Sequence, residues 1–372
     1  MSMNISAKIT GINYKPFLQS SLSQVQLNDF DINSAPTSCL IIDGQKSFAI
    51  SKWVSPKRTR SYPYERVYNT LGHGNKSITV IPIVKDEGFA GDRDFIQWDT
   101  ISLMSLLNVF VIFGYYSQAE KHRSRANKIT GQKFDNEYVL NKIAEIDNYH
   151  SSALHWNIGE IKRLSMIMDR VKESYARIAK KLKIKLHGAG GLESFQKQLS
   201  ENATTFFKDS SRTRSQQARS RELQTRQPKE ALATASKASI TIVNYLGGEY
   251  FLTVDETKIE NNILRLIESK HTNRSRLPSR NDIKDGLLKM MLFSNLTEFI
   301  ADSSPVNHVP VLQLTSALLK GSVDSRSTEN EIAKFNRRNK LNPLQQELIR
   351  SVFAGSKENR FEVILKFGKT KK

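Results

Sequence analysis

The chain is poor in cysteine and has no long apolar run, and both absences narrow the class of protein. Cys39 is the single cysteine, so internal disulfides and thiolate zinc sites are excluded. The longest apolar run, residues 101–116, is interrupted by polar side chains and is too short to span a bilayer. The first residues contain no secretory signal, so we expect a cytoplasmic protein that does not insert into membranes.

Motifs of several common enzyme classes are missing as well. There is no Walker A sequence, no GxGxxG dinucleotide fingerprint and no GxSxG nucleophile elbow, so kinase, dehydrogenase and esterase functions lose support. Positive charge, by contrast, is in excess: 56 Lys and Arg against 37 Asp and Glu give +19 at pH 7. Such a charge attracts polyanions, and nucleic acid is the commonest polyanionic partner.

The first half of the chain has the pattern of a mixed α/β fold. Residues 39–52 read as two apolar strands joined at a Gly-Gln turn, and residues 136–186 have helical spacing almost throughout. Between them, strand, helix and strand follow in the order that is typical of a βαβ unit. The elements expected there are a helix at 63–71, a strand at 79–84, a helix at 95–107 and a strand at 109–116.

The second half predicts a separate α+β unit at 235–372 that is mainly helical. It follows a stretch at 191–234 in which arginines alternate with small polar residues, which predicts a basic linker. A hairpin is expected at 240–254, split by two glycines. The further elements expected are helices at 256–269, 281–296, 329–339 and 343–354 and a strand at 361–367.

Three residues of the first half have the chemistry of a metal-dependent phosphodiesterase. Asp43 and Lys52 lie on the two strands of the predicted hairpin, and Glu65 lies on the helix that follows. Carboxylate oxygens suit a hard cation such as Mg²⁺, and an ammonium group offsets the charge that develops on the attacked phosphate. We therefore predict Asp43 and Glu65 as metal ligands and Lys52 as the catalytic lysine.

This pattern resembles the PD-(D/E)XK nuclease fold in its migrated-glutamate form, over residues 39–85. Restriction endonucleases of that group follow the lysine with tryptophan and an arginine-rich stretch, as Lys52 and Trp53 are followed here, and take the second acid from the next helix. The resemblance implies a restriction-endonuclease-like sheet flanked by helices, with a nuclease core and helical extension at 1–190. It also implies a Mg²⁺ cofactor and a recognition or dimerisation role for 235–372.

Basic side chains gather next to the predicted catalytic residues. Phosphate contacts require such cations, and they hold a nuclease on its substrate without reading the sequence. The residues predicted to bind DNA are Lys57, Arg58, Arg60 and Arg66.

A second acidic cluster offers an alternative metal site. Asp92, Asp94 and Asp99 lie within eight residues, and three carboxylates at this spacing could hold a cation. The structural interpretation of the same residues is a loop followed by a helix start, where Asp94 caps the helix.

Two functions from different classes are consistent with these patterns. The first is a Mg²⁺-dependent type II restriction endonuclease that cuts double-stranded DNA at a specific site, and a palindromic site would imply a homodimer. The second is a non-catalytic DNA- or RNA-binding protein that uses the same basic residues for phosphate contacts.

Overall fold

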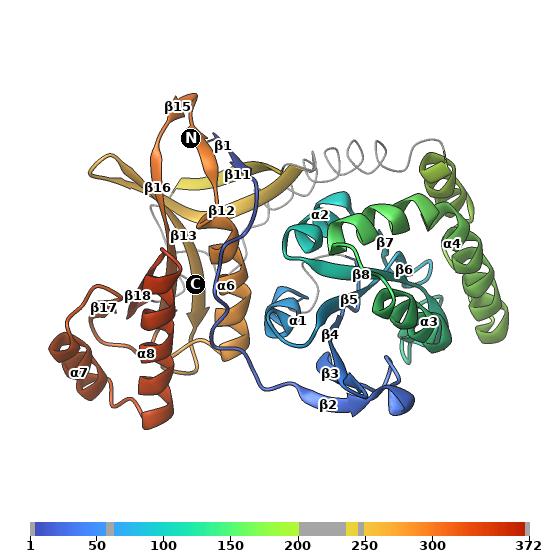
Figure 1. Cartoon of the computed structure of the whole chain (residues 1–372), viewed down its shortest axis with the longest axis horizontal. Helices are drawn as coiled ribbons and strands as arrows, with labels where there is room; N and C mark the ends of the chain where they lie inside the picture. Colours follow the sequence, from blue (N-terminus) through green and yellow to red (C-terminus); the bar gives the residue numbers. More distant parts are fainter. Residues whose placement is uncertain (1–3, 57–62, 201–235, 245–248, 369–372) are drawn as a thin grey trace. The chain divides into compact units, whose positions relative to one another are not determined.

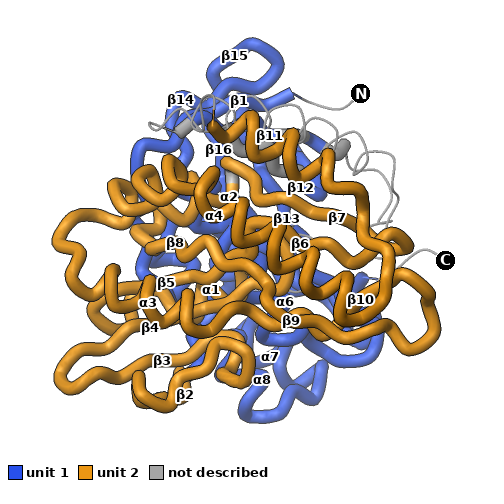
Figure 2. The backbone as a smooth tube through the Cα atoms, turned by 90° about the vertical axis from the view of Figure 1, so that its right-hand side faces the viewer, with its two compact units in different colours: residues 1–20, 212–372 blue, residues 21–211 orange. Residues whose placement is uncertain are grey.

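A computed structural model describes residues 4–56, 63–200, 236–244 and 249–368. The chain forms two compact units, shown in blue and orange in Figure 2. Unit 1 consists of residues 1–20 together with 212–372, and unit 2 consists of residues 21–211. Both units combine helices with mixed β-sheets, which confirms the predicted α/β class.

Unit 2 is built on a five-stranded sheet in the order β2-β3-β4-β5-β8. β3 and β4 form the predicted antiparallel hairpin, while β4, β5 and β8 run parallel to one another. The parallel strands are almost entirely apolar because helices and loops bury both faces. The strands are β2 (Ser23–Gln26), β3 (Ser38–Asp43), β4 (Lys46–Lys52), β5 (Lys76–Pro82) and β8 (Val109–Gly114), and the 3₁₀ helix η1 (Leu27–Asp29) follows β2.

The helices of unit 2 begin and end where the sequence provides capping groups. The Asp135 side chain accepts from Tyr138 N at the start of α3, and Ser152 accepts from His155 N at the start of α4. α4 ends at Lys183, which adopts a left-handed conformation. The helices are α1 (Pro63–Thr70), α2 (Trp98–Leu106), α3 (Asn136–Asp147) and α4 (Ala153–Leu182).

Two short hairpins complete unit 2. One joins β6 (Val84–Asp86) to β7 (Arg93–Phe95), and the other joins β9 (Tyr116–Lys121) to β10 (Ile129–Phe134). Neither hairpin belongs to the five-stranded sheet.

Unit 1 contains a nine-stranded sheet in the order β15-β14-β1-β11-β12-β13-β16-β18-β17. The N-terminal strand β1 pairs in parallel with β11, so the first residues of the chain complete a sheet formed by the last third. Figure 1 shows the blue N-terminal strand among the yellow and orange strands of this sheet. The strands are β1 (Asn4–Ile9), β11 (Ser236–Asn244), β12 (Glu249–Glu260), β13 (Ile263–Thr272), β14 (Thr297–Ala301), β15 (Ser304–Pro305), β16 (Asn307–Ser316), β17 (Ser322–Asp324) and β18 (Glu362–Phe367).

The centre of the unit 1 sheet follows a simple chain path. β11, β12 and β13 form an antiparallel meander, α6 (Arg280–Phe293) then covers the sheet, and β16 returns parallel to β13. Asn261 and Asn262 turn the chain between β12 and β13 with φ values of +51° and +60°, the backbone of a tight hairpin turn. The remaining helices are α7 (Glu329–Arg338) and α8 (Pro343–Glu358), each of which begins with a capping box.

The helix predicted at 256–269 is wrong, because this segment forms the end of β12 and most of β13. The apolar residues from Ile259 to Ile267 show the three- and four-residue spacing of a helix. This spacing arises because the Asn261-Asn262 turn separates the alternating patterns of the two strands. As a result, the second half of the chain contains far more sheet than its sequence suggested. The predicted linker at 191–234 begins as a helix through residue 200, and its remainder lies outside the described residues.

No helix in the described part of the chain is both long enough and apolar enough to cross a membrane.

Candidate active site in unit 1

The structure does not bring the predicted residues Asp43 and Lys52 together. Asp43 pairs with Lys46 beside the hairpin turn, whereas Ser38 pairs with Ser51 at the opposite end, next to Lys52. At about 3.4 Å per residue, six residues of strand separate the two ends by about 20 Å. The two residues therefore lie on adjacent strands, as predicted, but they cannot share one metal ion.

Lys52 is engaged in holding the chain that precedes β3. Its Nζ donates to the carbonyl oxygens of Ile32 at 2.5 Å, Ala35 at 2.7 Å and Asn33 at 3.3 Å. Burial lowers the pKa of this ammonium group, although Cys39 and Asp31 oppose the shift. All three hydrogens of the ammonium group thus have acceptors, which is the environment of a structural lysine.

Glu65 lies on α1, as predicted, but its carboxylate is buried and accepts from Asn69 Nδ2 at 2.5 Å. Arg66, predicted to bind DNA, is half-buried and donates from Nη1 to the Lys52 carbonyl at 3.0 Å. Burial lowers the pKa of its guanidinium. The other residues predicted to bind DNA, Lys57, Arg58 and Arg60, lie outside the described residues.

The alternative acidic cluster is also spread over different environments. Asp92 is exposed in the loop between β6 and β7. Asp94 is buried on β7, where its Oδ2 accepts from Ser55 Oγ at 3.2 Å. Asp99 lies in the first turn of α2, and its side chain is outside the described residues. Asp94 therefore precedes α2 on a strand and is not the cap of that helix, which begins after Gln97.

A different group of acids and lysines converges in unit 1, on β12, β13 and α6. The β12–β13 ladder reaches Glu256 opposite Ile267, and the next residues of the two strands are Asp255 and Glu268. Ser269 N donates to Asp255 Oδ2 at 2.8 Å, which fixes this carboxylate against β13. Lys270 follows on the same face of β13 as Glu268, because side chains alternate along a strand. Its Nζ lies 3.0 Å from Glu268 Oε1.

Burial and the neighbouring charges shift the pKa values of the two carboxylates in opposite directions. Burial and the neighbouring Glu268 raise the pKa of Asp255 to about 7, against the smaller lowering effects of Lys289, the Ser269 amide and Lys270. Burial also acts to raise the pKa of Glu268, but Lys289 and Lys270 outweigh it and the pKa is lowered. The surroundings therefore favour the ionised form of Glu268 and the protonated form of Asp255, and a cation beside Asp255 would oppose the upward shift of its pKa.

Helix α6 supplies the remaining charged groups. Asp285 Oδ2 lies 2.8 Å from Lys270 Nζ, and Lys289 Nζ lies 2.7 Å from Glu268 Oε2. Burial would lower the pKa of Lys270, but Glu268 and Asp285 raise it well above its ordinary value. The carboxylates therefore favour the charged form of Lys270, which suits stabilisation of negative charge and not proton abstraction.

A glycine on α6 leaves space for the lysine. A Cβ at Gly286 would lie 3.2 Å from Lys270 Cε and 2.7 Å from Leu312 Cδ1. The helix can therefore approach the β13–β16 strands at this point only because position 286 has no side chain.

The donor set suits a hard divalent cation. Mg²⁺ is commonly held by one or two carboxylates and keeps several waters, so Asp255 and Glu268 are sufficient protein ligands. No cluster of three or more His, Cys, Asp or Glu side chains that could hold a metal ion is found among the described residues.

Sequence reasoning missed these residues because it assigned Glu268 to a helix. Two signals were present: Asn261-Asn262 is a favourable dipeptide for a two-residue hairpin turn, and Glu268-Ser269-Lys270 places an acid and a lysine on one face of a strand. With the hairpin recognised, Asp255 would have been placed opposite Glu268.

No protein-family model, no curated protein and no solved structure matched the chain.

Proposed function

We propose that the chain is a Mg²⁺-dependent DNA endonuclease whose active site consists of Asp255, Glu268 and Lys270. The observation that carries the proposal is the meeting of Asp255 with Glu268 and Lys270 on neighbouring strands of a meander. An aspartate on one strand and Glu-x-Lys on the next resemble the acidic and lysine positions of the PD-(D/E)XK motif, although Val254 stands where the motif has its proline. The proposal therefore keeps the nuclease class suggested by residues 39–85 and moves its site to the other half of the chain.

Each residue has a defined task in the proposed hydrolysis. Asp255 and Glu268 would hold the cation, which lowers the pKa of an attacking water and polarises the phosphodiester. Lys270, kept charged by Glu268 and Asp285, would orient that water and stabilise the negative charge that develops on the phosphate. One P–O bond forms as a bridging P–O ester bond breaks, and the leaving oxygen takes a proton from water.

The charge of the whole chain supports DNA as the substrate. A net charge of +19 favours association with a polyanion, and the affinity should fall steeply with salt as counterions are released. Unit 2 provides a second compact body that could contribute recognition of a specific sequence, as a type II restriction endonuclease requires. A two-fold-symmetric site would be cut by a homodimer, with one active site for each strand.

The decisive experiment incubates the purified full chain with supercoiled plasmid in Mg²⁺ or in EDTA. We expect nicked and linear products in Mg²⁺ only, and a loss of at least about 100-fold in rate for Glu268→Gln, which keeps the shape but removes the charge. Asp43→Asn is the matched control, because Asp43 is an exposed acid at a hairpin turn and should not affect the rate. Equal activity of Glu268→Gln and wild type would contradict the proposal.

The alternative is a non-catalytic protein that binds DNA or RNA. It is favoured by the same positive charge, and in that case the network around Glu268 would be structural. Salt-sensitive binding of duplex DNA without cleavage in Mg²⁺, Mn²⁺ or Co²⁺ would establish this alternative.

A further inference from the structure

A cavity in unit 2, remote in sequence from the proposed active site, has the chemistry of a ligand site. It has a volume of about 470 Å³, within the range of roughly 300–1,000 Å³ that is usual for small-molecule pockets. The β9–β10 hairpin forms much of its wall, together with β6 and the chain around residue 32. The side chains used in the argument are Lys52, Lys85, Glu87, Tyr116, Lys128 and Phe134.

The polar wall of the cavity is positively charged. It contains three lysines and a single carboxylate, Glu87, so cations are in excess. The Lys52 ammonium is occupied by backbone carbonyls and contributes only its charge. Lys85 and Lys128 both approach Glu87, at 3.4 and 3.3 Å, and each retains further hydrogens that can point to a ligand.

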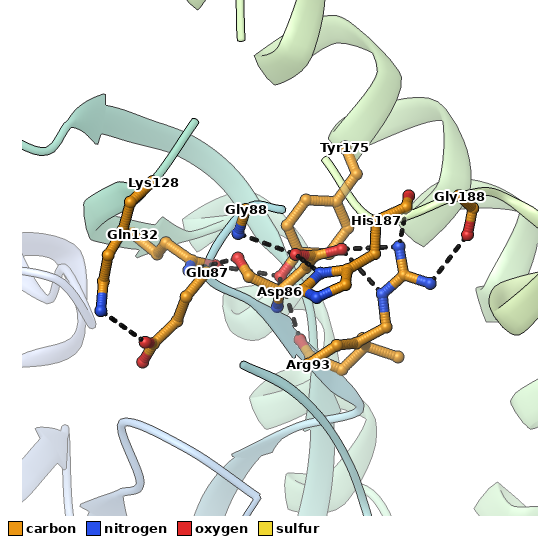
Figure 3. Close-up of polar contacts among 10 residues, drawn as sticks. Asp86, Glu87, Gly88, Arg93, Lys128, Gln132, Tyr175, His187 and Gly188 are labelled. Carbon is orange, nitrogen blue, oxygen red and sulfur yellow. Dashed lines mark hydrogen bonds and ion pairs between the residues drawn. The ribbon is translucent and has the colours of Figure 1, made fainter. Parts of the chain in front are cut away.

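The segment that carries Glu87 is held by several hydrogen bonds and ion pairs of its neighbour Asp86, as Figure 3 shows. The preceding residue, Asp86, is 1% exposed, and its carboxylate accepts from Arg93 Nε at 2.7 Å and Gly88 N at 2.8 Å and lies 2.8 Å from His187 Nδ1. Glu87 and Lys128 lie on the other side of this segment from His187 and Arg93. These contacts connect this part of the cavity wall to β7 and to the chain that follows α4.

The hairpin wall is held in a similar way. Gln132 donates from Nε2 to the Asp86 carbonyl at 2.8 Å and accepts from the Tyr175 hydroxyl at 2.9 Å. Tyr116 and Phe134 stack with ring centroids 4.6 Å apart and give the cavity an apolar side. A cavity lined by both lysines and aromatic rings suits a ligand with an anionic group attached to a flat or apolar body.

We propose that this cavity binds the phosphate group of a nucleotide, with Lys85 and Lys128 as its donors. Ammonium groups bind phosphate oxygens through charge-assisted hydrogen bonds, and the apolar wall can accommodate the sugar or base. Glu87 occupies the two ammonium groups in the absence of ligand and must yield part of these contacts when phosphate binds. The inference concerns a different unit from the proposed nuclease site and does not depend on catalysis there.

The phosphate can belong to a free nucleotide or to a nucleic acid strand, and the test separates the two sources. Binding to the full chain is measured in EDTA by calorimetry with inorganic phosphate, with deoxynucleoside 5′-monophosphates and with a duplex oligonucleotide. Binding of the monophosphates identifies a free-nucleotide site, whereas a Lys128-dependent affinity for the duplex alone identifies a strand phosphate. Both outcomes support the inference.

The variants are chosen to move the affinity in opposite directions. Lys85→Met and Lys128→Met should each weaken binding by about 10-fold, the effect of losing one charge-assisted hydrogen bond. Glu87→Gln should strengthen binding, because it removes the competing carboxylate. Lys133→Met is the matched control, since Lys133 is an exposed lysine on the same hairpin that does not line the cavity.

Two results would overturn the inference. One is the absence of binding of all three probes to wild-type protein at low salt. The other is an equal effect of Lys128→Met and Lys133→Met together with weaker binding by Glu87→Gln, because a site for phosphate cannot lose affinity when its only carboxylate is neutralised.

Discussion

Each unit of the protein has a lysine at or near the end of a strand in an antiparallel hairpin, and the two lysines have opposite surroundings. Lys52 in unit 2 is bound by three backbone carbonyls, and burial lowers its pKa. Lys270 in unit 1 is bound by Glu268 and Asp285, and these carboxylates raise its pKa. Carbonyl dipoles satisfy the buried ammonium group of Lys52 and fix a loop, whereas two carboxylates surround the ammonium group of Lys270 with negative charge.

This difference shows why the lysine alone is a poor marker of a catalytic site. In sequence, both lysines follow an apolar strand that has an acid nearby. Glu268 lies beside Lys270 because it is two residues away on the same strand, whereas Asp43 is on the strand next to Lys52 and the pairing register places it at the far end of the hairpin.

The largest effect is expected from removing the charge of Lys270. Lys270→Met should reduce plasmid cleavage by about 1,000-fold, because the developing phosphate charge loses its nearest fixed cation. Initial rates of plasmid nicking measure the effect. Lys258→Met is the control, since Lys258 is exposed and pairs with Glu260 at the far end of β12, and its rate should equal that of wild type. Similar losses in both variants would remove Lys270 from the active site.

The corresponding change at Lys52 should affect stability and not cleavage. Lys52→Met leaves carbonyl groups without their donor and should lower the free energy of unfolding by about 2–3 kcal/mol. Urea unfolding measures the change, and cleavage per folded molecule should stay near the wild-type rate. Lys46→Met on the same strand removes only an exposed ion pair with Asp147 and should cost less than about 1 kcal/mol. A stably folded Lys52→Met variant that no longer cleaves DNA would show that Lys52 contributes to catalysis and not to stability.

A smaller effect is expected from crowding Lys270 without touching its charge. Gly286→Ala places a Cβ against Lys270 and Leu312 and should slow cleavage by about 10-fold through displacement of the ammonium group. Gly159→Ala on α4 is the matched control, because no atom lies within 4 Å of its Cβ. That variant should be stabilised by about 0.5–1 kcal/mol and keep its activity. If Gly286→Ala cleaves at the wild-type rate, the neighbouring atoms have made room for the new Cβ without displacing the Lys270 ammonium group.

The smallest effect concerns the pH dependence of stability in metal-free buffer. The pKa of Asp255 is raised from 3.8 to about 7, so between these values the folded state holds a proton that the unfolded state has lost. The stabilisation that comes from this proton is fully present below the pKa of Asp255 in the unfolded chain. It is lost as the pH rises through the pKa of Asp255 in the folded protein. Asp255→Asn should therefore gain stability relative to wild type, by about 1 kcal/mol, as the pH rises from about 5 to about 8.

Mg²⁺ provides the control for that measurement. Because the cation binds the ionised carboxylate, saturating Mg²⁺ should stabilise wild type more than Asp255→Asn at pH 8. A flat difference across the pH range, or an equal response of both proteins to Mg²⁺, would argue against a cation at Asp255.

Much of the fold could be predicted from local patterns. The hairpin at 39–52, the helix at 63–71 and the helical region at 136–186 correspond to β3–β4, α1 and α3–α4. These segments have regular periodicity and clear turn or capping residues, such as Gly44 with φ +58° and Asp135 at the start of α3. Local signals of this kind do not depend on residues far away in the chain.

The candidate site could not be located from local patterns, because it depends on which strands pair and in which register. The apolar residues around Ile263 are compatible with either a helix or a strand, and only the Asn261-Asn262 turn separates the two. The mutual approach of Asp255, Glu268 and Lys289 also requires α6 to pack on β13, a contact between segments that sequence periodicity does not specify. The residue types suggested a nuclease, but the proposed site could be located only with the pairing register of β12 and β13.

The pairing of β1 with β11 has a consequence for the order in which the chain can fold during synthesis. Ile5 has Ile240 as its partner, so β1 leaves the ribosome long before the strand beside it exists. Unit 2 can close in the meantime, whereas the sheet that carries Asp255 and Glu268 stays incomplete until nearly the entire polypeptide has been made. A truncated translation product would thus lack the complete sheet on which the proposed site lies, and a fragment without β1 would expose the β11 edge to pairing with other chains.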